Sequence, residues 1–137
     1  MARKGPDNDD RTPLLEGELT GKIIAAFYET YNVLGFGFLE SVYKKALAIE
    51  LRLRGLSVQE EVPVDVFYKG LRVGLFRFDD LVEECVAVEI KASATLSPTD
   101  KAQTLNCLTS TSIDVGLLLH YGPEPKVYRF VSPRVHQ

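Results

Sequence analysis

The chain has 137 residues, the length of a single domain, and carries 16 basic against 19 acidic residues for a net charge of −3. Apolar residues make up 45% of it, which excludes disorder of the whole chain, a collagen-like repeat and a disulfide-stapled mini-protein. The negative net charge argues against the strongly basic surface that is typical of nucleic-acid-binding proteins.

The N-terminal segment and the cysteines bear on the cellular compartment in which we expect the protein. Residues 1–13 are mostly polar and lack the apolar core of a signal peptide, so we expect a disordered N-terminal arm there and one folded domain over residues 14–137. No stretch approaches the roughly 18 apolar residues of a membrane span. Cys85 and Cys107 have neither the number nor the spacing of a disulfide framework or a zinc site. We therefore expect a reduced, cytoplasmic protein with no membrane partner.

Two helices are predicted at the start of the domain. Apolar residues recur at three- and four-residue steps between Leu19 and Leu34, and the glycines of residues 35–37 should end this first helix. A second apolar stripe predicts a helix from about residue 38 to residue 54, with Gly55 directly after its end.

The period then changes to that of strands. Alternating apolar residues predict strands over residues 58–68, 71–79 and 85–92, with a turn at residues 69–70 and a connection over residues 80–84. Ser97 and Pro98 are typical of a helix start, and this helix should run to about Thr111. Two further strands are expected over residues 115–119 and 127–131. The predicted order is therefore α-α-β-β-β-α-β-β, an α/β (α+β) domain.

Three charged residues of the second and third strands suggest chemistry. Glu89 and Lys91 are two apart on a strand and so share a face, and Asp79 reaches the same spot if the two strands pair as a hairpin. Two carboxylates form a hard-oxygen site suited to Mg²⁺, with the backbone carbonyl of Ile90 as a further candidate ligand. Lys91 would activate the attacking water or stabilise charge on phosphoryl oxygens. The arrangement suits hydrolysis of a phosphodiester.

Each of these residues also has a plainer interpretation. An E-x-K pair on a strand is most often a solvated polar face. The neighbouring Asp79 and Asp80 are also typical of a turn, because aspartate accepts backbone hydrogen bonds there.

A longer set of motifs favours the chemical interpretation. Residues 37–43 have the pattern G-x-x-E-x-x-Y, and Asp79, the triplet of residues 89–91 and Gln103 follow in order. This set resembles the GxxExxY family, a branch of the PD-(D/E)XK nuclease superfamily, over residues 19–131. The resemblance implies a restriction-endonuclease-like αβββαβ core, with a mixed central sheet flanked by helices.

The resemblance also implies roles for individual residues. It makes Asp79 and Glu89 metal ligands and Lys91 the catalytic lysine, with Mg²⁺ as cofactor and Mn²⁺ as its substitute. Glu40 matches an acidic residue that completes such sites, and Gln103 matches a glutamine that faces the same cleft. Asp80 stands where the family carries an apolar residue, so the choice between Asp79 and Asp80 as ligand stays open, with Asp79 favoured by the alignment.

Glu40 and Tyr43 lie three apart on a helix and share a face. Glu40 alternatively serves as a carboxylate at a helix N-terminus, where the helix dipole favours it. Tyr43 either orients a phosphate or is a core aromatic with its hydroxyl at the rim.

We therefore predict a Mg²⁺-dependent nuclease acting on DNA or RNA. The alternative is a catalytically inactive nuclease-fold domain used for binding or assembly, as a homodimer for example; hydrolysis of a small nucleotide is a third hypothesis. The net charge does not exclude nucleic acid, because a bound cation offsets two acidic charges and phosphates respond to the local field.

Overall fold

The structure, a computed structural model, describes residues 16–136. Its elements are α2 (Gly17–Leu34), α3 (Glu40–Leu53), β1 (Val58–Tyr68), β2 (Leu71–Val82), β3 (Val86–Lys91), α4 (Pro98–Thr109), β4 (Val115–Tyr121), β5 (Pro125–Val131) and the 3₁₀ helix η1 (Pro133–His136). The predicted order of helices and strands is confirmed. The expected arm over residues 1–13 lies outside the described residues, and the single domain over residues 14–137 stays a prediction. Within the described part, no helix is both long and apolar enough to cross a membrane.

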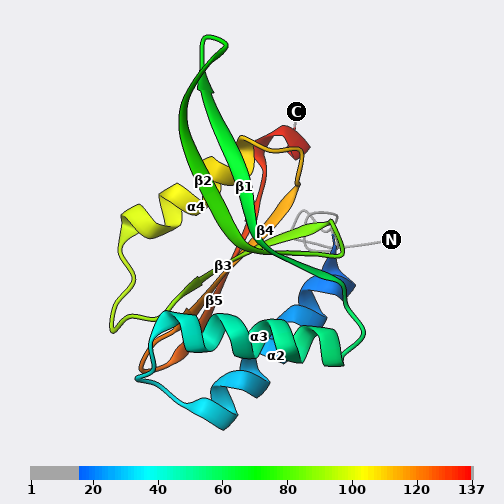
Figure 1. The fold of residues 1–137 in the computed structure, drawn as a ribbon, viewed down its shortest axis with the longest axis vertical. Helices are drawn as coiled ribbons and strands as arrows, with labels where there is room; N and C mark the ends of the chain where they lie inside the picture. The colour runs from blue at the N-terminus through cyan, green and yellow to red at the C-terminus, as the bar shows by residue number, and fades with distance from the viewer. Residues whose placement is uncertain (1–15, 137) are drawn as a thin grey trace.

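The five strands form one mixed sheet in the order β1-β2-β3-β4-β5. β3 and β4 run parallel, and the other neighbouring pairs are antiparallel. The parallel pair is joined through α4, since parallel strands need a long crossover connection. The predicted α+β class with a mixed sheet flanked by helices is confirmed (Figure 1).

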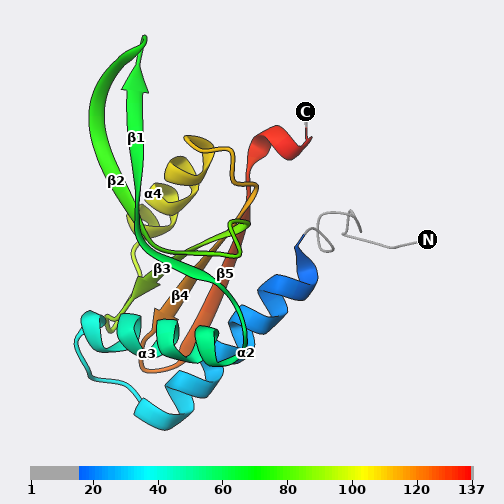
Figure 2. The same cartoon turned by 45° about the vertical axis from the view of Figure 1, so that its right-hand side comes forward.

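The helices cover the two faces of the sheet differently. α2 and α3 pack on one face, where Val86, Val88 and Ile90 of β3 belong to the main core cluster. α4 packs on the other face, where its Cys107 and Leu108 join a second cluster that includes Ala87 (Figure 2). β3 is therefore covered on both sides, so Glu89, which points to the α4 side, is buried among apolar residues.

A buried tyrosine shapes the connection between α2 and α3. Tyr43 is fully buried and stacks on Tyr121 with ring centroids 4.2 Å apart. Its hydroxyl donates to the carbonyl of Gly35 and accepts a hydrogen bond from the backbone N–H of Phe38. Of the two roles that the sequence allowed for Tyr43, the structure shows the core aromatic. The hydroxyl of Tyr43 also holds the segment that leads into Glu40, the first residue of α3.

β2 is longer than predicted. The prediction ended this strand at Asp79, but Asp80 to Val82 continue it and pair with β3. The turn instead lies at Glu83 and Glu84, which both take positive φ values. Two adjacent aspartates resemble a turn in sequence, and only their pairing with the buried β3 makes them strand residues.

The β1–β2 hairpin reaches far beyond the sheet. β1 and β2 pair from Val58↔Val82 to Tyr68↔Leu71, whereas β2 pairs with β3 only from Asp80 to Val82. The outer part of the hairpin, residues 63–77, therefore projects from the molecule, as Figures 1 and 2 show, and is called the projecting hairpin below. Lys69 and Gly70 form its tip with φ values of 50 and 81°, as predicted for a two-residue turn.

Candidate active site

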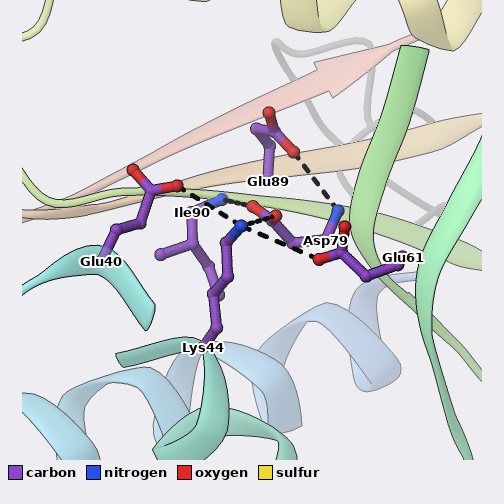
Figure 3. A network of polar contacts seen from close by, with 6 residues as sticks. All are labelled: Glu40, Lys44, Glu61, Asp79, Glu89 and Ile90. Atoms are coloured by element: carbon purple, nitrogen blue, oxygen red, sulfur yellow. Dashed lines mark hydrogen bonds and ion pairs between the residues drawn. The ribbon is translucent and has the colours of Figure 1, made fainter. Parts of the chain in front are cut away.

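The candidate site lies where β2 and β3 separate. Asp79 is one residue beyond the last paired residue, Asp80, and its side chain replaces the missing ladder contact: Oδ2 accepts a hydrogen bond of 2.7 Å from the N–H of Ile90. In return, the backbone N–H of Asp79 donates to Oε1 of Glu89 at 3.3 Å (Figure 3). The structure thus brings together the two carboxylates that the sequence singled out.

The two neighbouring aspartates point to different environments. Asp80 lies opposite Val88, a member of the core under α2 and α3, while the backbone N–H of Asp79 donates to the side chain of Glu89. Among the described residues, Oδ2 of Asp80 has no hydrogen-bond partner. Burial, and then the charge of Asp79, raise the pKa of Asp80 to about 7. Of the two, Asp79 is the residue that lies beside Glu89.

The carboxyl group of Glu89 is buried, and this environment disfavours its ionised form. Its residue is only 7% exposed. Burial, followed by the charge of Asp79, raises the pKa of Glu89 to about 8, and the charge of Lys91 opposes this rise. A buried carboxyl group with a raised pKa beside a second carboxylate is typical of a functional site, because burial and a neighbouring like charge both disfavour its ionised form.

Lys44 of α3 is a cation at this site that the sequence analysis did not assign to it. Its Nζ lies 2.7 Å from Oδ1 of Asp79, 3.5 Å from Oε2 of Glu40 and 3.8 Å from Oε2 of Glu61 (Figure 3). Partial burial alone would lower the pKa of Lys44, but the hydrogen bond and charge of Asp79 and the charges of the two glutamates outweigh it and raise that pKa. The spacing of Glu40 and Lys44, four apart on a helix, was the signal in the sequence.

The other predicted residues surround this centre at different depths. Lys91 is half-buried on the same face of β3 as Glu89. Glu40 reaches the site through Lys44, since its carboxylate contacts that ammonium. Gln103 is exposed on α4, one turn before Cys107, and the charge of Glu89 adds to burial in raising the pKa of Cys107 to about 11. Gln103 therefore lies on the same side of α4 as Cys107, the side nearer to Glu89.

Comparison with known proteins supplies the family. The pattern of the PD-(D/E)XK nuclease superfamily matches residues 17–130, which include every residue of the candidate site. The chain belongs to the PD-(D/E)XK nuclease superfamily. No curated protein matches the sequence significantly.

A solved structure agrees with this fold. The present structure matches the crystal structure of SSO0001 with a TM-score of 0.53 and 19% sequence identity. The match covers 90% of the present chain and 62% of the SSO0001 chain. The chain thus spans less than two thirds of the length of SSO0001. At this identity the likeness shows a shared fold.

Nucleases of the PD-(D/E)XK superfamily typically depend on a metal ion, and the residues present fit one. Asp79 and Glu89 offer two carboxylates, and the ammonium of Lys44 shows that the oxygens of Asp79, Glu40 and Glu61 gather around a positive charge. Within residues 16–136, no group of three histidine, cysteine or acidic side chains is arranged to hold a metal alone. Mg²⁺ does not require one, because it binds through one or two carboxylates and completes its shell with waters and substrate phosphates.

The backbone carbonyl of Ile90, the third predicted ligand, lies on the side of β3 that faces β2. The N–H of Ile90 points toward Asp79, and the N–H and C=O of one strand residue point to the same edge. By contrast, a cavity of about 450 Å³ at the start of α2 is lined by residues such as Leu19, Leu56 and Cys85, none of which belongs to the site.

Proposed function

We propose that the protein is a Mg²⁺-dependent nuclease that hydrolyses phosphodiester bonds in DNA or RNA, with Mn²⁺ as a substitute ion. The observation that carries the proposal is the hydrogen-bonded pair of Asp79 and Glu89, which come from adjacent strands and share one buried corner with Lys91 nearby. Membership in the nuclease superfamily supports the reaction class. The G-x-x-E-x-x-Y pattern of residues 37–43 supports assignment to the GxxExxY branch.

The residues divide the work of the reaction among them. Asp79, Glu89 and the carbonyl of Ile90 would hold the ion, which supplies Lewis acidity toward the phosphoryl oxygens and a more acidic bound water. Lys91 orients the attacking water or donates to the phosphoryl oxygens as their charge grows. Glu40 and Gln103 act from the rim, where Glu40 positions Lys44 and Gln103 lies open to a substrate.

A nucleic acid needs a cationic contact surface, and the projecting hairpin offers one. At the C-terminal end of α3, Arg52 and Arg54 pair with glutamates. The projecting hairpin carries Lys69 at its tip and Arg72 and Arg77 on β2, the strand that leads to Asp79. Arg72 pairs with the one acidic residue of this segment, Asp65 on β1, at 2.8 Å. A two-stranded β-ribbon fits the major groove of B-form DNA, and aromatic side chains on it stack on bases.

Cleavage assays test the proposal. The purified chain is incubated with Mg²⁺ or Mn²⁺ and with single-stranded DNA, duplex DNA, structured RNA and mononucleotides. Cleavage of a nucleic acid is expected with metal, and none in EDTA or with the Asp79→Ala and Lys91→Ala variants. Lys22→Ala, on the exposed surface of α2, is the matched control and should cleave normally. Absence of metal binding by calorimetry together with no cleavage of any substrate contradicts the proposal.

A non-catalytic binding or assembly domain is the second candidate. It is favoured by the exposed apolar side chains of the projecting hairpin, since Leu71 and Val73 are 73% and 63% exposed. Under this alternative the chain forms a homodimer or binds a partner with EDTA present, and its mass by size-exclusion chromatography with light scattering falls when Leu71→Asp is introduced. Nucleic-acid cleavage by the purified chain argues against it.

A further inference from the structure

Lys44 lies at the centre of the acidic side chains of the candidate site. Three carboxylates lie within 4 Å of its Nζ, and the shortest of these contacts, 2.7 Å, is to Oδ1 of Asp79. Glu40 reaches it from one turn earlier on α3, and Glu61 reaches it from β1. The ammonium therefore links the helix to both strands of the hairpin.

Both carboxylate oxygens of Asp79 are engaged in this arrangement. Oδ2 accepts from the N–H of Ile90, and Oδ1 contacts Lys44. The backbone bond to Ile90 holds β2 and β3 in register, so it persists as long as the strands keep their positions. Oδ1 is therefore the oxygen that has to change partner when Asp79 binds anything else.

The contact of Lys44 has an electrostatic reason. Like charges a few ångströms apart repel one another strongly at the low effective dielectric constant of a protein surface, so a positive charge among these carboxylates is stabilising. Lys44 supplies one positive charge at the end of a flexible side chain, which is 32% exposed. A divalent cation would supply two and would bind the same oxygen more strongly.

We propose that Lys44 is a tethered counter-ion of the metal site: it holds Oδ1 of Asp79 until a divalent cation binds, and then transfers to Glu40 and Glu61. This inference rests on the proposed metal-dependent function. Lys44 is thus a positioning residue that lowers metal affinity and keeps the site assembled without metal. The two glutamates already within 4 Å of Nζ provide the second position.

The experiment measures metal binding, not cleavage. Mn²⁺ is titrated calorimetrically into the wild-type chain, Lys44→Met, Lys44→Arg and Lys45→Met. Lys45 is the matched control, because it is the next residue on α3 and is exposed. Lys44→Met is expected to bind Mn²⁺ at least ten-fold more tightly, equivalent to about 1.4 kcal/mol, while Lys44→Arg, which keeps the charge, and Lys45→Met stay within about two-fold of wild type.

Thermal unfolding gives a second readout. In EDTA, Lys44→Met is expected to melt below wild type, and saturating Mn²⁺ should raise its melting temperature more than that of wild type. If Lys44→Met folds only with Mn²⁺, the inference is supported, because the cation then replaces the lysine. If it stays unfolded with Mn²⁺, the inference is overturned.

The outcomes separate the inference from the function on which it rests. Equal or weaker Mn²⁺ binding by Lys44→Met, or Lys44→Arg binding as tightly as Lys44→Met, overturns the role of Lys44 alone. Absence of Mn²⁺ binding by the wild type and every variant overturns the proposed metal-dependent function and the inference with it.

Discussion

The backbone N–H of Asp79 donates a hydrogen bond to the carboxylate of Glu89, while the carboxylate of Asp79 accepts one from Ile90, the residue after Glu89. The two strands therefore lock each other at the point where their ladder ends. This exchange fixes the spacing of the two carboxylates through backbone groups, which are far less mobile than long side chains. These bonds would preorganise the corner for the proposed cation.

Asp79 and Asp80 provide a matched pair of substitutions. Asp79→Asn is expected to lower Mn²⁺ affinity and metal-dependent cleavage by at least about 100-fold, because a metal ion contributes several kcal/mol to such reactions. Asp80→Asn should leave both within about three-fold, since Asp80 faces the core below Val88. Calorimetry and cleavage assays measure the two effects. The reverse ranking would make Asp80 the ligand.

The stability of the metal-free protein should fall as pH rises. The pKa of Glu89 is about 8 in the folded protein against an ordinary value of 4.5, so the folded state binds more protons than the unfolded state between these values. The free energy of unfolding therefore decreases as pH rises from about 5 to 8. Melting temperatures in EDTA across this range measure the decrease. The pKa of Asp80, raised to about 7, adds to the same trend, so Glu89→Gln should weaken the pH dependence without abolishing it. A stability that rises with pH contradicts the buried, protonated state of Glu89.

Metal binding should oppose this decrease in stability with rising pH. A cation at Glu89 requires its ionised form, so binding releases protons and Mn²⁺ affinity should rise as pH approaches 8. Calorimetric titrations in buffers of different ionisation enthalpy measure the released protons. Affinity that does not change between pH 6 and 8 would place the ion away from Glu89.

Replacing Asp80 by leucine is expected to stabilise the protein. Asp80 is 2% exposed, and its Oδ2 has no hydrogen-bond partner among the described residues. A buried polar atom without a partner costs about 1–3 kcal/mol, so Asp80→Leu should raise the free energy of unfolding by about that amount in EDTA at pH 8. Chemical denaturation measures it. Asp79→Leu is the control and should destabilise, because it strips Lys44 and the N–H of Ile90 of their partner.

Tyr43 should matter for stability and not for the ion. Tyr43→Phe removes the two hydrogen bonds to Gly35 and Phe38, at a cost of about 1–2 kcal/mol in the free energy of unfolding. Mn²⁺ affinity should stay within two-fold of wild type. The control is Tyr28→Phe at an exposed position of α2, which should change neither quantity. A large loss of cleavage by folded Tyr43→Phe would restore the phosphate-orienting role considered from sequence.

The projecting hairpin should dominate nucleic-acid affinity. Substituting Lys69 and Arg77 together by alanine is expected to weaken binding of duplex DNA about ten-fold at low salt. The slope of the logarithm of the binding constant against the logarithm of salt concentration should also become shallower, by the amount expected for the loss of about two phosphate contacts. Fluorescence anisotropy at several salt concentrations measures both. Lys22→Ala on α2 removes one charge elsewhere and should have little effect. Unchanged affinity in the double variant assigns the contact surface to another part of the molecule.

The amino-acid sequence alone was sufficient for the order of elements, because helix and strand periods are local properties of the chain. The α2 and α3 boundaries, the turn at Lys69 and Gly70, and the alternating faces of β3 were all predicted within a few residues. The motif spacing also identified Asp79, Glu89 and Lys91 as a set. Each of these conclusions depends on residues that are near one another along the chain.

The tertiary structure decided what depends on distant segments. Adjacent strand residues point to opposite faces, so only the pairing of β2 with β3 determines that Asp79, and not Asp80, meets Glu89. The packing of α3 beside β1 and β3 places the ammonium of Lys44 on Asp79, a contact between residues that are distant in the sequence. Charge pairing and burial depend on residues that are distant in the sequence, so a net charge of −3 says little about the corner where three carboxylates lie around Lys44.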